Sequence, residues 1–387
     1  MTLRTRLLSA LALAATAAAA APVPNAVVEK PGAERITVSV TTPPGEYTTV
    51  LKRNLQISGY FKLAVNDAAI TVSGTPGTSV AATGKGKTMT ATTAFSDARS
   101  ERMAARRFAD AMVKTFTDGG KGYATTRIAF IERKGADNAE LYVCYPDGYD
   151  IRSLTSDRCA AVGPRWAPDG ENIYYTSFLQ KFGNVYRINA STGQRAPLAP
   201  FKGTATGAAV APDGRRCAIV LSYQGNPELY ILDFGTKMAK RMTSTLNAAE
   251  ASPCWSPDGS KIAYVSDQSR HPQIYILDVA TQKSKRFTNK GTENTNPDWN
   301  GDGKLVWASK RQGQTVLMVA DPAAGEGAAI SVTKPGSWEH PSWAADGRHI
   351  VASRDKAIFI VDTDPDPDEP TQIFRNAGNW MNPAFSR

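Results

Sequence analysis

A seven-residue motif recurs five times in the second two-thirds of the chain and limits what the chain can fold into. Each copy begins with Pro-x-Trp or Ala-x-Val and ends in Asp-Gly, and its glycines recur every 44 or 45 residues. A fixed period of this length indicates stacked supersecondary units, each of which buries its apolar face against its neighbours. The copies span residues 164–170, 208–214, 253–259, 297–303 and 341–347.

Each repeat is predicted to contain four short strands. Pro-Asp-Gly makes a tight turn after the first strand, because Pro presets φ, Asp bonds its own backbone and Gly accepts a positive φ. The second strand follows at once, the third alternates apolar residues and usually ends in Asp, and the fourth is short. Four strands in about 44 residues make one blade of a β-propeller. The second strands are predicted at 127–132, 172–177, 217–223, 261–266, 304–309 and 349–353.

The first of these six second strands has no inner strand before it. Residues 382–386 repeat the Pro-x-Trp strand near the other end of the chain, and no second strand follows them. We therefore expect this C-terminal strand to complete the blade that begins at Arg127, which closes the ring and removes its open edges. The predicted fold is mainly β: a small N-terminal α+β domain, followed by a six-bladed β-propeller over 123–387.

Residues 1–21 have the pattern of an export signal. Two arginines precede the apolar run Leu7 to Ala15, and an alanine tract then supplies the small residues that signal peptidase requires. The apolar run is far shorter than the roughly 20 residues of a membrane-spanning helix. We expect cleavage near Ala20 or Ala21, no membrane span, and a mature protein in an exported compartment.

Residues 22–122 show no repeat and are predicted to form the small α+β domain. Gly59 and the pair Gly119-Gly120 are the predicted stops of its two helices. The predicted elements, in chain order, are a strand at 36–40, a helix at 47–58, a strand at 61–65, short strands within 70–94 and a helix at 96–116.

Four cysteines would face an oxidising compartment after export. An even number permits disulfides, and four cysteines allow three pairings. Cys217 and Cys254 fall in or beside predicted strands, where a small buried thiol is the more common state. The chain has no C-x-x-C motif and no clustered His/Cys spacing, so neither a metal nor a cofactor is expected.

No set of residues has the spacing of an enzyme site. There is no G-x-S-x-G elbow, and His271, His340 and His349 lie in different parts of a blade without metal-ligand spacing. Asp362 to Glu369 is predicted to be a solvated acidic turn, because it lacks the glycine of a calcium loop. The formal net charge is +9, but no run of five Lys or Arg indicates a nucleic-acid partner.

The residues just before each Pro-x-Trp proline are the best candidates for a binding site. The loops that enter the inner strands of a propeller converge at one mouth of the channel, and polar, acidic and aromatic residues there are typical of protein-binding surfaces. For any single position, an ordinary polar loop residue is as good an explanation. The repeated tryptophans, by contrast, are expected in the core between blades. The candidate partner-binding residues are Glu250, Ser252, Asn294, Asn296, Glu339, His340 and Asn382.

The domain order and several motifs resemble the TolB family, the periplasmic components of the Tol-Pal cell-envelope system. The resemblance covers nearly the whole mature chain. It rests on Leu55 to Phe61, on Thr126 to Phe130, on Glu140 to Val143, on Asp147 to Tyr149, and on the five turns.

This resemblance implies a periplasmic scaffold without enzymatic activity, expected to be monomeric, that supports outer-membrane integrity and constriction during cell division. It implies the peptidoglycan-associated lipoprotein Pal as the partner at the mouth. It also implies TolA as a partner of the mature N-terminus, although Ala21 to Lys30 departs from the family's pattern there. The alternative is a propeller enzyme or carbohydrate-binding protein that uses the same mouth, which turnover dependent on His340 or Glu339 would favour.

Overall fold

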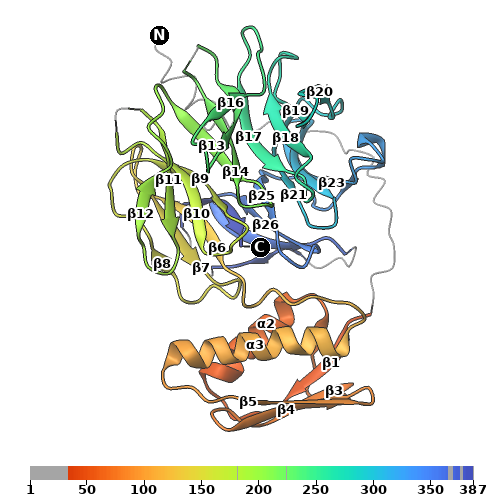
Figure 1. Cartoon of the computed structure of the whole chain (residues 1–387). Helices are drawn as coiled ribbons and strands as arrows, with labels where there is room; N and C mark the ends of the chain where they lie inside the picture. The colour runs from red at the N-terminus through yellow and green to blue at the C-terminus, as the bar shows by residue number, and fades with distance from the viewer. Residues whose placement is uncertain (1–33, 181, 224, 365–368, 375–377, 387) are drawn as a thin grey trace.

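The structure is a computed structural model that describes residues 34–180, 182–223, 225–364, 369–374 and 378–386 (Figure 1). These residues form one five-stranded sheet with two α-helices, followed by six four-stranded sheets. The predicted fold class, a small N-terminal α+β domain and a six-bladed propeller, is confirmed. The predicted export signal and the segment that the resemblance assigns to TolA lie outside the described residues.

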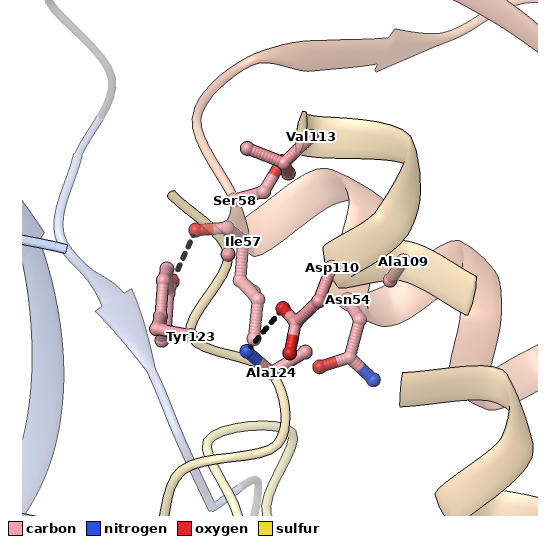
Figure 2. Close-up of a pocket in the computed structure, with 9 residues that line it drawn as sticks. Asn54, Ile57, Ser58, Ala109, Asp110, Val113, Tyr123 and Ala124 are labelled. Atoms are coloured by element: carbon pink, nitrogen blue, oxygen red, sulfur yellow. Dashed lines mark hydrogen bonds between the residues drawn. The ribbon is translucent and has the colours of Figure 1, made fainter. Parts of the chain in front are cut away.

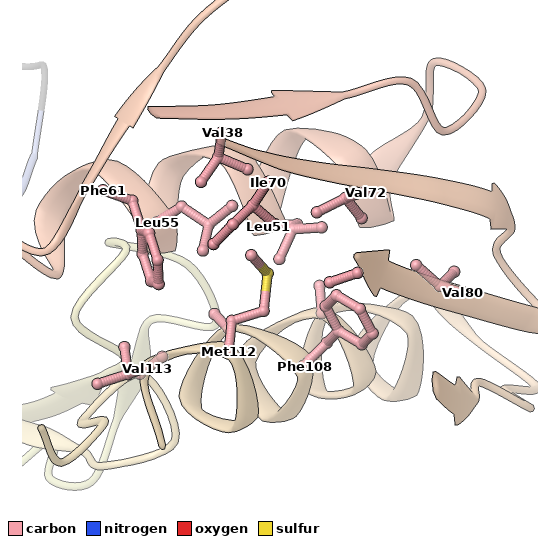
Figure 3. Packing of buried hydrophobic residues seen from close by; sticks show 14 of the residues in the cluster. Val38, Leu51, Leu55, Phe61, Ile70, Val72, Val80, Phe108, Met112 and Val113 are labelled. Atoms are coloured by element: carbon pink, nitrogen blue, oxygen red, sulfur yellow. The ribbon is translucent and has the colours of Figure 1, made fainter. Parts of the chain in front are cut away.

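The N-terminal domain packs two helices on one face of a mixed sheet with the order β2-β1-β3-β4-β5. Apolar residues at helical spacing, among them Leu51, Leu55, Phe108 and Met112, pack against Val38 of the sheet (Figure 3). The predicted strands and helices of this domain are therefore present. Their bounds are β1 Ile36–Val40, α2 Glu46–Ile57, β2 Phe61–Leu63, β3 Ile70–Thr75, β4 Ser79–Gly84, β5 Lys87–Thr92 and α3 Ala98–Phe116.

Each of the six propeller sheets runs from an inner to an outer strand, and we number them as blades 1 to 6 along the chain. Blade 1 consists of β29 (Trp380–Phe385), β6 (Ile128–Arg133), β7 (Ala139–Cys144) and β8 (Arg152–Ser153). Blade 2 consists of β9 (Ala161–Trp166), β10 (Asn172–Ser177), β11 (Asn184–Asn189) and β12 (Arg195–Pro197), and blade 3 of β13 (Ala205–Val210), β14 (Arg216–Leu221), β15 (Glu228–Asp233) and β16 (Ala239–Arg241).

The other three blades repeat this arrangement. Blade 4 consists of β17 (Glu250–Trp255), β18 (Lys261–Ser266), β19 (Gln273–Asp278) and β20 (Ser284–Arg286). Blade 5 consists of β21 (Glu293–Trp299), β22 (Leu305–Arg311), β23 (Gln314–Ala320) and β24 (Ile330–Ser331), with the 3-10 helix η1 (Glu326–Ala328) before its last strand, and blade 6 of β25 (Glu339–Trp343), β26 (His349–Arg354), β27 (Ala357–Asp362) and β28 (Thr371–Gln372).

The C-terminal strand closes the ring as predicted. Strand β29 pairs antiparallel with β6, with Phe385 opposite Ile128. Beyond the strand, the Ser386 amide donates to the Arg127 carbonyl over 2.8 Å. Blade 1 therefore joins the last strand of the propeller to its first three, and the inner edge of β6 is paired.

The repeated tryptophans lie in the core between blades, as predicted. Trp166, Trp255, Trp299 and Trp343 are all buried. The Trp166 indole N–H donates to a carbonyl of the preceding inner strand, that of Ala384, over 3.0 Å. Each such residue therefore fills the space between two blades, which explains why one bulky residue recurs in every repeat except that of blade 3.

The N-terminal domain packs against the end of the propeller that carries the Asp-Gly turns. Helices α2 and α3 face that end, and the sheet β1–β5 lies on their far side (Figure 1). Arg106 of α3 donates to both carboxylate oxygens of Asp147 in the turn after β7, at 2.7 and 3.0 Å, and both side chains are fully buried. We call the opposite end of the propeller, where the inner strands begin, the mouth face.

A second contact between the domains corrects one prediction. Arg348, in the turn after β25, donates to both oxygens of Asp362 at 2.7 and 2.6 Å and to the Gly59 carbonyl at 3.3 Å. Asp362 is therefore part of a domain contact and not of a solvated turn, because the guanidinium compensates its partly buried charge. Residues 365–368 of the predicted turn lie outside the described part of the chain.

Two further findings concern the described ranges. They contain no helix that is long and apolar enough to cross a membrane. The four cysteines all lie within them and form no disulfide, and Cys217 and Cys254 are buried next to or within strands, as predicted. Burial raises the pKa of the Cys217 thiol to about 12, which keeps it protonated.

Candidate functional site

Six equivalent inner-strand positions share one unusual backbone conformation. They lie inside the strands, where the pairing register between inner and second strand shifts, and not in the loops before the strands. The predicted loop location is therefore wrong. The positions, with their φ angles, are Gly163 (59°), Gly207 (62°), Ser252 (49°), Asn296 (52°), His340 (51°) and Asn382 (51°).

A β-bulge explains this conformation. Two residues of the inner strand, such as Ser252 and Pro253, lie opposite one residue of the second strand, and the first of the two adopts a left-handed backbone. Glycine and asparagine tolerate a positive φ best. The asparagines at this position, which suggested a binding site, therefore also have a purely structural cause.

The seven candidate residues divide by burial. Glu250, Asn294 and Asn382 are buried, whereas Ser252, Asn296 and His340 are half-buried. Glu339 is the exposed one, with 61% of its side chain accessible. Glu250, Asn294 and Asn382 therefore present little side-chain surface to a partner, because neighbouring blades cover them.

Asn294 holds two blades together. Its side-chain amide donates to Gln273 Oε1 and to the Lys290 carbonyl, both at 2.8 Å, and its Oδ1 accepts from the Trp307 indole at 2.9 Å. All these partners belong to blades 4 and 5 or to the loop between them. Asn294 therefore supports the mouth face from within.

Glu250 occupies the same position one blade earlier and has fewer partners. Its Oε1 accepts from the Thr245 hydroxyl at 3.0 Å, and its buried Oε2 makes no hydrogen bond. Burial, with smaller contributions from Glu228 and Asp267, raises the pKa of Glu250 to about 7. A carboxyl with this pKa is protonated in a large fraction of molecules at neutral pH.

His340 presents a neutral imidazole at the mouth face. Burial, with a smaller contribution from the positive charge of Arg165, lowers the pKa of His340 to about 4. Its Nδ1 is buried without a hydrogen bond, and the nearest carboxylate oxygen, Glu339 Oε2, is 3.9 Å away. Buried polar atoms usually find partners, so this nitrogen is an exception, and it is enclosed by the protein rather than open to another molecule.

Arg165 and Asp298 form a polar pair that sequence reasoning missed. Arg165 Nη1 is 2.8 Å from Asp298 Oδ1, and Nη2 donates to the Pro297 carbonyl at 3.1 Å. Asp298 is buried, and its second oxygen accepts from the Trp343 amide at 2.8 Å. The available signal was the middle residue of Pro-x-Trp. It is charged in only two of the six inner strands: Arg165, Ala209, Cys254, Asp298, Ser342 and Ala384.

A small cavity lies between the two helices and the segment that connects the domains (Figure 2). Its volume is about 10 Å³, room for one water molecule. Asp110 accepts from the Ala124 amide at 2.8 Å, and the Tyr123 hydroxyl donates to the Ile57 carbonyl at 2.5 Å. These contacts fix the connection between the domains, and the space is too small for a metabolite. The described residues contain no group of three or more side chains that could hold a metal ion.

The chain has a six-bladed propeller with an α+β domain at one end and half-buried polar groups at the other. This arrangement places it among two-domain propeller proteins. The chain belongs to the TolB family, because residues 114–387 match the family described as TolB beta propeller domain.

Known relatives agree with this assignment. The Tol-Pal system protein TolB of Nitrosomonas europaea is 41% identical over 103 residues, which cover 27% of this chain and 24% of that protein. The protein of the same name from Aromatoleum aromaticum is 38% identical over 103 residues, with the same two shares. The match therefore spans about a quarter of the length of these curated relatives.

Solved structures show the same fold over a larger part of the chain. The crystal structure of TolB from Acinetobacter baumannii covers 92% of this chain and 98% of its own, with a TM-score of 0.78 and 24% identity. The structure of a putative TolB from Agrobacterium tumefaciens covers 67% of this chain and 93% of its own, with a TM-score of 0.54 and 19% identity.

Proposed function

We propose that this chain is a periplasmic scaffold of the Tol-Pal system that catalyses no reaction and binds a Pal-like lipoprotein at its mouth face. The observation that carries the proposal is the pair of accessible polar side chains there, Glu339 with 61% of its side chain exposed and the neighbouring His340 with 24%. A partner that supplies a donor to the Glu339 carboxylate would make a desolvated polar contact, and such contacts set specificity in protein interfaces.

The seven candidate residues would take part in two ways. Ser252, Asn296, Glu339 and His340 are accessible enough to contact the partner directly. Glu250, Asn294 and Asn382 would act through the strands and loops that they support. The remaining parts of the proposal are export by the signal at residues 1–21, a monomeric mature protein, a second contact with TolA through its N-terminus, and a role in outer-membrane integrity and cell constriction.

Calorimetry with the soluble domain of the organism's own Pal lipoprotein tests this function. We expect Glu339→Ala and His340→Ala to weaken binding at least about 10-fold, corresponding to about 1.4 kcal/mol, while the melting temperature stays nearly unchanged. Lys283→Ala is the matched control, because Lys283 is exposed in the turn after β19, on the face opposite the mouth.

Two results would contradict the proposal. If the wild-type protein does not bind Pal, the proposed partner is wrong. Turnover of an ester, glycoside or lactone that both mouth variants lose would instead favour the enzyme alternative.

A further inference from the structure

Large apolar side chains are exposed together on one part of the mouth face. Nine large apolar residues are exposed in the described chain, and five of them lie on three loops over blades 2 and 3. Leu246 is the most accessible, at 95%. We call these five the rim patch: Phe178, Leu179, Phe182, Tyr223 and Leu246.

The loops of the rim patch are bonded to one another and to their neighbours. The Ala205 amide donates to the Gly183 carbonyl at 2.9 Å, and Asn226 Nδ2 donates to the Thr245 carbonyl at 3.0 Å. Between them, the Thr204 amide donates to the Ser222 hydroxyl at 3.1 Å. These hydrogen bonds hold the neighbouring loops next to one another. The apolar side chains that the loops carry therefore lie on one surface.

The propeller repeat does not account for the rim patch. In the other blades, the loops between second and third strands carry polar or charged residues at their tips, such as Asp267 to His271 in blade 4, Gln312 in blade 5 and Asp355 in blade 6. Contiguous exposed apolar surface on a folded protein marks an interaction site more often than single exposed residues do. The asymmetry therefore points to a partner that covers blades 2 and 3.

Charges beside the rim patch indicate the chemistry of that partner. Arg158 and Lys202 lie on the neighbouring loops, between blades 1 and 2 and between blades 2 and 3, with no anionic partner among the described residues. Of the nearby acidic groups, Asp157 is paired with Arg195, and Asp267 accepts from the Ala249 amide in the loop of Leu246 at 2.8 Å. A complementary surface would therefore combine apolar with acidic side chains.

We propose that the rim patch docks an apolar and acidic surface of the same protein that binds the mouth face, and so extends that interface beyond the inner strands. This inference rests on the proposed function. A protein is favoured over a membrane because anionic bilayers attract clusters of about four to eight basic residues, whereas the described loops around the rim patch offer three, Arg158, Lys202 and Arg270.

Calorimetry with the soluble Pal domain also tests the rim patch. Leu246→Asp and Tyr223→Asp each place a negative charge where an apolar contact with an acidic surface is expected, and both side chains are largely exposed, so folding should be preserved. We expect each variant to bind at least about 10-fold more weakly, with an unchanged melting temperature. Met238→Asp, in the turn after β15 on the opposite face and also highly exposed, should bind within about 2-fold of wild type.

The outcomes separate the two proposals. Wild-type protein that fails to bind Pal contradicts the proposed function and this inference with it. Variants that bind like wild type, while His340→Ala weakens binding, overturn the rim patch alone. Wild-type flotation with phosphatidylglycerol vesicles that Leu246→Asp abolishes, with Pal binding unchanged, would assign the rim patch to a lipid surface and overturn the protein partner.

Discussion

Arg165 and Asp298 form an ion pair that joins the inner strands of two opposite blades. Arg165 belongs to blade 2 and Asp298 to blade 5, which are three blades apart in a ring of six, so the 2.8 Å contact crosses the central axis. The other inner strands carry only small side chains at this position. The pair therefore occupies the centre of the propeller and connects blades that share no sheet edge.

Removing Asp298 should destabilise the whole ring. Asp298→Ala leaves the Arg165 guanidinium partly buried without its counter-ion, and it also removes the acceptor of the Trp343 amide. Breaking a buried ion pair costs about 3–5 kcal/mol of stability. Because Arg165 is 22% exposed, we expect the free energy of unfolding to fall by an amount near the lower end of this range. Urea unfolding measures this loss, and a change below about 0.5 kcal/mol would show that the pair contributes no net stability.

Deleting residues 381–387 should unfold blade 1 and destabilise the propeller. Strand β29 supplies the inner strand of that blade, and the Ala384 carbonyl accepts from the Trp166 indole of blade 2. The truncated chain would expose the edge of β6 and lose contacts on both sides of the missing strand. A melting temperature equal to that of the full chain would contradict the assigned closure.

The sequence predicts the blades well because their turns and core use strong local signals. The Asp-Gly turns and the recurring tryptophans each have one structural cause, so the number of blades and the shared first blade could both be derived. The bulge at Ser252 and its equivalents could not. A positive φ inside a strand depends on pairing with the second strand, which the spacing of residues before Pro-x-Trp does not reveal.

The candidate site was predicted only in part for a related reason. His340 and Glu339 are accessible at the mouth face, whereas Asn294 is buried by Gln273 and Trp307 of neighbouring blades. Whether a polar residue faces solvent or an adjacent blade depends on contacts between repeats, and the sequence of one repeat does not contain them.

Trp255→Ala should cost about 3–5 kcal/mol of stability through a core cavity. Trp255 is buried between blades 3 and 4, and its indole N–H donates to the Ala209 carbonyl at 2.9 Å. His340→Ala at the mouth face serves as the comparison, since its ring is partly exposed and smaller than an indole and its Nδ1 makes no hydrogen bond that could be lost. Thermal unfolding of the two variants distinguishes a core residue from a binding residue, and equal losses would contradict that distinction.

Two buried carboxylates replace an amide pair where blade 3 meets blade 4. Between blades 4 and 5, Asn294 Nδ2 donates directly to Gln273 Oε1 at 2.8 Å. The corresponding residues one blade earlier are Glu250 and Glu228, and both lie within 3.4 Å of the single Thr245 hydroxyl. Glu228 accepts from further donors, including the guanidinium of Arg241 at 2.9 Å. Of the two carboxylates, Glu250 is therefore the one that protonation stabilises more.

Glu250 should therefore make stability depend on pH. The folded protein holds a proton on Glu250 up to pH of about 7, whereas the unfolded chain releases it near the ordinary pKa of 4.5. Stability from this group is therefore complete below pH 4.5, falls as the pH rises towards 7, and is lost above it. The total change is at most about 3 kcal/mol.

Glu250→Gln should remove this pH dependence, because the amide keeps the shape of the protonated carboxyl and reproduces the uncharged arrangement of the next blade. Urea unfolding from pH 5 to pH 8.5 measures the effect, and we expect the free-energy gap between variant and wild type to widen in the variant's favour as the pH rises. Glu140→Gln is the matched control. Glu140 occupies the place of Glu228 in blade 1 and accepts from Thr155, but the residue in the place of Glu250 is Ala161. The control should keep the pH dependence of wild type, and a Glu250→Gln variant that keeps it as well would show that Glu250 is ionised throughout this range.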